Sequence, residues 1–195
     1  NLKDKKIGIT GSNGFIATNI LRYLEKIKIN KKKIILLNSK KVNLYNLKSI
    51  VSNTKDIDYL IHLSAATGGV VYTKNNSSEQ MYRSMIKDLN IYEACKINKI
   101  KKLITLGNFH AFPKNIKKGL KEEMLHGNLP TNIHLGVGWS KRSLPIYNQV
   151  YQRDSETKYI TLFSPNVYGP HDTLDKNLGH IIPSLIIKCL KKKNF

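Results

Sequence analysis

Short apolar runs rich in β-branched residues alternate along the chain with longer segments in which apolar residues recur every three or four positions. The short runs predict buried strands, and the longer segments predict amphipathic helices. In the segment 15–26, for example, Ile16, Ile20 and Leu24 would fall on one face of a helix. We expect strands at residues 6–10, 33–37, 58–63, 102–106 and 158–163, and helices at residues 15–26, 79–96, 140–153 and 181–191.

This alternation of strand and helix is typical of repeated βαβ units. Such units give a parallel sheet with helices on both faces, so the expected fold class is α/β, a Rossmann-type doubly wound parallel sheet. Pro145 lies inside the segment 140–153 and is expected to kink that helix or to mark a later start. Since the sequence has no internal repeat and no shift in composition, we expect a single domain over residues 1–195.

A glycine-rich segment joins the first expected strand to the first expected helix. Its spacing is G-x-x-G-x-x-A, in the strand–turn–helix setting that a dinucleotide fingerprint requires. Gly11 would allow the tight turn, Gly14 would let backbone approach a diphosphate, and the helix N-terminus would offer it free N–H groups. The alternative is a glycine turn that holds no ligand. The cofactor-binding residues expected here are Gly11, Ser12, Asn13, Gly14, Phe15 and Ile16.

The end of the second expected strand indicates which dinucleotide would bind. Enzymes that use NAD tend to place an acidic residue there for the ribose 2′-hydroxyl. This chain has Asn38, Ser39 and Lys40 instead, and the next acidic residue is Asp56. Hydroxyl and ammonium groups suit a 2′-phosphate, so NADP(H) is the expected cofactor and NAD the alternative. A second alternative is that Lys40 is one more surface lysine.

Charge is the most conspicuous feature of the composition, with 33 basic residues against 13 acidic ones and a formal net charge of +20. Such a balance can indicate a nucleic-acid or membrane-surface partner. However, only four of the basic residues are arginines, the side chain that specific phosphate and base recognition favours. We therefore expect solvated surface charge, with no nucleic-acid and no membrane partner.

The cellular setting is expected to be cytoplasmic. No apolar stretch is long enough to span a bilayer, and no signal-peptide pattern opens the sequence. Cys95 and Cys189 are too few for a disulfide framework, and their spacing matches no zinc motif, so no metal is expected.

Several further segments carry a resemblance to a known family. Segments 42–44, 62–66, 68–70, 106–107, 112–114 and 130–132 match it, and the segments 164–172 (SPNVYGPHD) and 179–183 (GHIIP) are the most specific. On these residues the chain resembles the extended short-chain dehydrogenase/reductases, the NAD-dependent epimerase/dehydratases of nucleotide sugars. Within them it is most similar to the GDP-L-fucose synthase branch, whose members use NADP. The resemblance also implies that the family's C-terminal substrate-binding portion is largely missing.

The resemblance implies a catalytic set that this sequence fills only in part. The family uses a Ser or Thr, a Tyr that relays a proton, and a Lys. In register these positions hold Asn108, Val137 and Lys141, and no tyrosine occurs between Tyr92 and Tyr147. Lys141 is expected to open the helix at 140–153. The epimerising Cys and His of the branch correspond to His110 and His180, which are either a two-base pair or residues without a catalytic role.

Two functions follow as hypotheses. The first is a GDP-sugar epimerase/reductase that binds NADP(H) and uses an altered acid/base set. The second is a catalytically inactive relative that acts as a cofactor-binding partner or regulatory subunit. The resemblance also implies a homodimer through helices 79–96 and 140–153. The remaining expected site residues are Leu63, Ala65, Ala66 and Lys141 for the cofactor, and Asn166, His171 and His180 for the nucleotide sugar.

Overall fold

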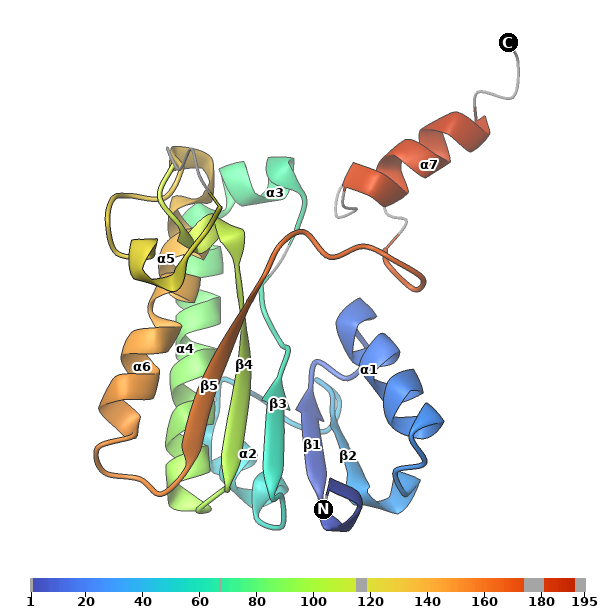
Figure 1. Ribbon diagram of the computed structural model, residues 1–195, viewed down its shortest axis with the longest axis vertical. Helices are drawn as coiled ribbons and strands as arrows, with labels where there is room; N and C mark the ends of the chain where they lie inside the picture. The colour runs from blue at the N-terminus through green and yellow to red at the C-terminus, as the bar shows by residue number, and fades with distance from the viewer. Residues whose placement is uncertain (1, 67, 115–118, 174–180, 192–195) are drawn as a thin grey trace.

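A computed structural model describes residues 2–66, 68–114, 119–173 and 181–191. Its five strands form one parallel sheet in the order β2-β1-β3-β4-β5 (Figure 1). The five predicted strands are confirmed, with ends that differ by at most two residues. They are β1 (Ile7–Thr10), β2 (Ile34–Leu37), β3 (Tyr59–His62), β4 (Lys102–Asn108) and β5 (Lys158–Ser164).

The strand order places a change of direction at β1. The chain runs outward from β1 to β2 and then returns to add β3, β4 and β5 on the other side. In open parallel sheets, ligands bind beyond the carboxyl ends of the strands at such a switch point. A ligand site is therefore expected at the carboxyl ends of β1 and β3, where Thr10 pairs with His62.

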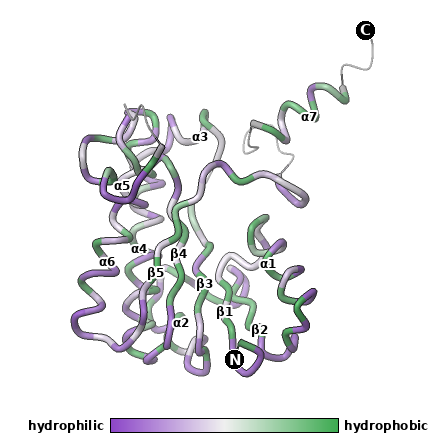
Figure 2. Tube along the Cα trace, viewed as in Figure 1, coloured by the Kyte–Doolittle hydropathy of each residue, from purple (hydrophilic) through white to green (hydrophobic). Residues whose placement is uncertain are grey.

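Helices cover both faces of the sheet, as the sequence predicts (Figure 1). On one face lies α1 (Phe15–Lys26), whose Ala17 and Leu24 pack on Ile7 and Ile9. The opposite face is covered by α2 (Leu47–Thr54), α4 (Ser77–Ile97) and α6 (Leu144–Tyr151). In Figure 2 apolar colour runs along β1 and β4, while apolar and polar residues alternate along the helices. The other helices are α3 (Val70–Asn75), α5 (Leu135–Arg142), α7 (Ile181–Lys191) and the 3₁₀ turns Leu2–Asp4, Lys31–Lys33, Phe109–Ala111, Glu122–Met124 and Asn132–His134.

The predicted helix at 140–153 is wrong as a single element. The structure has α5 and α6 there, separated at Ser143, and Pro145 stands in the first turn of α6. Proline is suited to a first turn, where its missing N–H would have no partner in any case. Lys141 accordingly lies in the last turn of α5 and does not open a helix.

The helices α2 and α3 are not predicted from the sequence. The start of α2 carried a local signal, since the side chain of Asn46 caps it by accepting a hydrogen bond from the N–H of Ser49 at 3.1 Å. In the described part of the chain, no helix is both long enough and apolar enough to cross a membrane.

Candidate cofactor and active site

The glycine turn between β1 and α1 has the conformation that its sequence predicts. Gly11 has φ +61°, and a Cβ built there would lie 3.0 Å from the backbone nitrogen of Ser64. Gly14 caps α1 and donates its N–H to the Gly11 carbonyl at 2.9 Å, so the turn folds back on itself. Inside the turn the Ser12 hydroxyl is buried, and it has no hydrogen-bond partner among the described residues. A side chain on Gly11 would therefore displace the turn from β3.

Thr10 fastens this turn to the neighbouring strand. Its hydroxyl oxygen accepts hydrogen bonds from the backbone N–H groups of Leu63 at 3.1 Å and Ser64 at 3.4 Å. The same hydroxyl lies 2.7 Å from Nδ1 of His62. Both residues lie on the sheet face that α4 covers, so the hydroxyl and the imidazole meet in the interior.

His62 continues the network toward α4. Its Nε2 lies 2.9 Å from Oδ1 of Asp88, and both side chains are buried. Burial lowers the pKa of His62 below its ordinary value, although the hydrogen bond to Asp88 opposes this. The imidazole is therefore neutral near pH 7. In the network it accepts a hydrogen bond from Thr10 at Nδ1 and donates one to Asp88 from Nε2.

Asp88 faces a second group, the lysine that the sequence singles out. Oδ2 of Asp88 lies 3.8 Å from Nζ of Lys141, whose side chain is only 8% exposed. Burial would raise the pKa of Asp88, but the charge of Lys141 and the hydrogen bond from His62 outweigh it and hold the pKa below its ordinary value. The centre of the molecule thus contains a buried ion pair linked through His62 and Thr10 to the glycine turn.

A cavity of about 580 Å³ opens beside the turn at the carboxyl ends of β1, β2 and β3. Seven of the expected cofactor-binding residues line it, while Ser12, Phe15, Ile16, Lys40, Ala66 and Lys141 do not. Its volume is in the range typical of small-molecule sites. The lining consists of Gly11, Asn13, Gly14, Leu37, Asn38, Ser39, Val42, Asn43, Leu44, Tyr45, Leu63, Ser64, Ala65, Arg83 and Lys87.

Two cationic residues of this lining, Arg83 and Lys87, were not expected. They lie one turn apart on α4, more than 60 residues after the glycine turn, and no local motif marks them. Lys87 is only 7% exposed, and its Nζ lies 3.4 Å from the Ser64 hydroxyl. Burial lowers the pKa of Lys87 to about 8, and the nearby charges of Lys141 and Arg83 lower it further against the opposing effect of Asp88.

Two of the residues expected to act on substrate, Asn108 and His110, lie at the end of β4. Asn108 ends that strand, and its buried Oδ1 has no hydrogen-bond partner within the described ranges. His110 follows in the 3₁₀ turn Phe109–Ala111 and stacks on His134, with ring centroids 3.7 Å apart. Burial, with a smaller effect of His134, lowers the pKa of His110 to about 4. The imidazole is therefore neutral near pH 7, but so low a pKa also makes it a weak base.

Arg142, which the sequence did not single out, holds α5 against this turn. Its guanidinium donates hydrogen bonds to the carbonyl oxygens of Ala111 and Asn128, each at 2.7 Å. Gly138 of α5 lies so close that a Cβ there would be 2.5 Å from the His110 carbonyl oxygen. The turn that carries His110 is therefore fixed on the helix that carries Lys141.

The position at which the resemblance implies a relay tyrosine holds Val137. Val137, which stands four residues before Lys141, is buried. Tyr92 and Lys96 reproduce the Y-x-x-x-K spacing, but Tyr92 is fully buried and stacks on Tyr159 with ring centroids 5.2 Å apart. Burial raises the pKa of Tyr92 well above its ordinary value. Tyr92 is a core residue.

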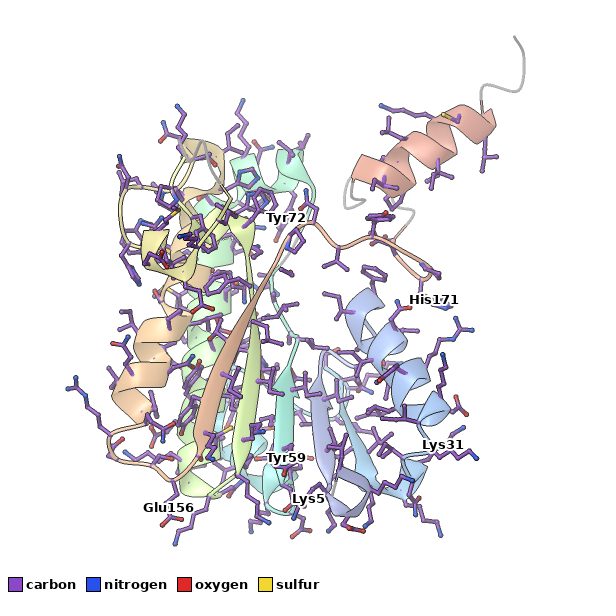
Figure 3. The ribbon with its side chains drawn as sticks, viewed as in Figure 1. Lys5, Lys31, Tyr59, Tyr72, Glu156 and His171 are labelled. Carbon is purple, nitrogen blue, oxygen red and sulfur yellow. The ribbon has the colours of Figure 1, made fainter. Side chains whose placement is uncertain are left out.

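Asn166 and His171, two of the residues expected to bind a nucleotide sugar, do not line the cavity. Asn166 is exposed, and the loop that follows it passes over the carboxyl ends of the strands and lies against α1 (Figure 3). There Asn19 donates a hydrogen bond to the Pro170 carbonyl at 2.9 Å, and His171 lies 2.6 Å from the Arg22 guanidinium. His180 falls outside the described residues.

Comparison with known proteins places this geometry in a family. Residues 7–195 match the model of the NAD dependent epimerase/dehydratase family. The chain belongs to this family. A GDP-L-colitose synthase from Yersinia pseudotuberculosis is 31% identical to it over 186 residues, which are 94% of this chain and 59% of that protein. The GDP-L-fucose synthase of Escherichia coli (strain K12) is 28% identical, over 95% of this chain and 58% of the relative.

Solved structures agree with the epimerase/dehydratase fold. A GDP-L-fucose synthetase from Naegleria fowleri bound to NADP has a TM-score of 0.86 and 25% identity, over 97% of this chain and 62% of that one. A GDP-D-glycero-L-gluco-heptose synthase from Campylobacter jejuni has a TM-score of 0.88 and 24% identity, over 95% and 54%, and supports the fold alone. The chain spans somewhat more than half the length of the relatives it matches.

Proposed function

We propose that the protein binds NADP(H) in the cavity beside the glycine turn and belongs to the epimerase/dehydratases that act on GDP-sugars. The observation that carries the proposal is the turn itself: Gly11 at positive φ, held against Ser64 by Thr10, with Gly14, the N-cap residue of α1, in the lining of the cavity. Free N–H groups at a helix start bind phosphate. The buried and unpartnered Ser12 hydroxyl adds a polar group to the same turn.

The proposed roles of the residues follow from where they lie. Backbone at Gly11 and Gly14 would hold the diphosphate, and Asn38 and Ser39, which line the cavity without an acidic neighbour in its lining, would meet the ribose 2′-phosphate. When bound, the cofactor supplies hydride exchange at the nicotinamide ring. The proposal of a GDP-sugar as substrate is supported by the relatives, which include synthases of GDP-L-colitose and GDP-L-fucose.

Acid/base chemistry would have to come from an altered set. The Asn108 amide could donate a hydrogen bond to a substrate carbonyl, but an amide does not relay a proton as a hydroxyl does. His110 is neutral near pH 7 and would be the proton acceptor, although its lowered pKa makes it a weak base in the free protein. Lys141 would remain in place through its ion pair with Asp88. We propose His180, beyond the described residues, as the second member of the pair.

Calorimetric titration tests the binding step, and absorbance at the nicotinamide band tests turnover. We expect NADP(H) to bind more tightly than NAD(H), and the reduced cofactor to be consumed when a GDP-4-keto-6-deoxy sugar is added. The Gly11→Ala variant is the matched control, because the added methyl group would displace the turn from Ser64. A wild-type chain that binds neither dinucleotide would refute the proposal.

Val137, which stands where the resemblance implies the relay tyrosine, favours a second candidate function, a cofactor-binding relative without catalysis. Tight NADP(H) binding with no turnover of any GDP-sugar tested would support this candidate. The double substitution Val137→Tyr and Asn108→Ser tests whether the missing groups are the reason. Activity that appears only in that variant would assign the wild-type chain to the inactive class.

A further inference from the structure

We infer that Lys87, supported by Arg83 one turn earlier on α4, binds the diphosphate of the dinucleotide from the side of that helix. This inference rests on the proposed cofactor site and adds to it a residue whose charge has no anionic partner among the described residues. It gives α4 a part in cofactor binding, in addition to the glycine turn and the end of β2.

The first support is the position of the Lys87 side chain. Lys87 is only 7% exposed, and it lines the cavity together with Gly11 and Gly14. Its one hydrogen bond within the described structure runs to the Ser64 hydroxyl, at a long 3.4 Å. The backbone of Ser64 in turn lies against Gly11. Ser64 therefore lies between the Lys87 ammonium group and the turn that would hold the diphosphate.

The second support is the lack of an anionic partner for this charge. The neighbouring Asp88 is engaged by His62 at Oδ1 and by Lys141 at Oδ2. Among the described residues no carboxylate lies within ion-pair distance of Lys87. Its other close neighbour, Tyr45, offers only the face of its ring, 5.9 Å from Nζ. A buried cation without a partner is costly, so an arriving phosphate would gain from it more than from a solvated lysine.

The charged groups around Lys87 determine how its proton responds to a ligand. Arg83 on the same helix and Lys141 on α5 disfavour the protonated form, and Asp88 favours it. With a pKa of about 8, the free amine is partly deprotonated in mildly alkaline solution. A bound diphosphate adds negative charge and raises that pKa, so binding takes up protons near pH 8. Affinity is then full at lower pH and declines as the pH rises through about 8.

Arg83 occupies the same wall but is already held in place. Its guanidinium donates to the Tyr45 hydroxyl at 2.8 Å and to the Glu79 carboxylate at 2.9 Å. These contacts orient Arg83 and Tyr45 together at the rim of the cavity. Arg83 therefore acts as a supporting charge, while Lys87 is the group whose protonation changes when the ligand arrives.

The experiment measures binding of NADP⁺ and of NAD⁺ by calorimetry at pH 6.5 and 8.5, in two buffers that differ in ionisation enthalpy. Lys87→Met is compared with Lys87→Arg and with Lys96→Met, which replaces a half-buried lysine on the same helix that pairs with Asp154 outside the cavity. We expect Lys87→Met to weaken both dinucleotides roughly 10- to 100-fold, the worth of a hydrogen bond to a charged group, and to abolish proton uptake. Lys87→Arg should bind without proton uptake, and Lys96→Met should behave like the wild type.

A urea denaturation of each variant separates binding from folding. Replacing an unpartnered buried ammonium by Met should leave the midpoint unchanged or raise it, whereas a merely structural Lys87 would give a lower midpoint. Wild-type affinity with proton uptake intact in Lys87→Met would overturn the inference while leaving the cofactor proposal standing. A loss confined to NADP⁺ would also overturn it, because it would assign Lys87 to the 2′-phosphate. If the wild type binds neither dinucleotide, the cofactor proposal and the inference fail together.

Discussion

The buried pair of Asp88 and Lys141 offers a direct test of the described core. Replacing Asp88 by Asn keeps the shape of the side chain and its ability to accept a hydrogen bond from His62, but removes the charge that faces Lys141. At 3.8 Å, two unit charges in an environment of effective dielectric constant about 20 attract each other by about 4 kcal/mol. Breaking a buried pair by removing one partner typically costs about 3–5 kcal/mol.

That loss is large beside the total stability of a domain, which is about 5–15 kcal/mol. Urea denaturation measures it, with fluorescence of Trp139, the single tryptophan of the chain, as the signal. Trp139 lies on α5 two residues before Lys141, so it reports on the affected helix.

The control is the double variant Asp88→Asn with Lys141→Met, which removes the unbalanced cation as well. It should recover most of the stability that Asp88→Asn loses, and the two substitutions should be strongly non-additive. A loss below about 1 kcal/mol in Asp88→Asn, the range of an exposed ion pair, would contradict the reasoning, as would a double variant no more stable than Asp88→Asn.

Three further predictions concern acid, the glycine turn and the surface charge. Burial lowers the pKa of His62, so below about pH 6.5 the unfolded chain binds a proton there that the folded chain does not bind, and the lowered pKa of Asp88 acts in the same direction at lower pH. The urea midpoint should therefore fall from pH 7.5 to pH 5, and a constant midpoint would count against the buried network. Gly11→Ala should cost about 1–2 kcal/mol of stability, because Gly11 has φ +61°, whereas Gly127→Ala, where the nearest atom to an added Cβ is 3.5 Å away, should be nearly neutral. The net charge of +20 should give no tight binding to DNA in a filter assay at physiological salt, and retention at nanomolar protein would show that the charge serves a nucleic acid.

The elements that the sequence predicted well are those whose signals are local. The helix Phe15–Lys26 begins and ends where the apolar spacing says, because Gly14 precedes it and its apolar face is continuous. The expectation that Pro145 interrupts the segment 140–153 is confirmed, since α6 begins at Leu144, but the start of α5 at Leu135 is not predicted. Packing of α5 against α4 and of α6 against β5 helps to determine where these helices lie.

The site divides in the same way. Gly11 and Gly14 were found because the turn, the strand before it and the helix after it are contiguous in sequence. Lys87 and Asp88 were not found, since their roles depend on contacts with Ser64 and His62, which precede them by 23 and 26 residues. The periodicity of α4 does not predict these contacts, because a buried charged residue interrupts the apolar pattern but does not indicate which residue it contacts.

The hydrogen bonds of Thr10 have a consequence for the order in which the protein folds. They join β1 to residues 62–64, which lie 52 to 54 positions further along the chain. A peptide that contains only β1, the glycine turn and α1 therefore lacks the groups that fix the turn, and a nascent chain acquires them only when β3 pairs beside β1. Closing so long a loop is entropically unfavourable and comes late relative to local helix formation. A dinucleotide bound at the turn, as proposed, would stabilise the assembled sheet as a whole, and dinucleotide affinity and the folded structure should be lost in one cooperative step.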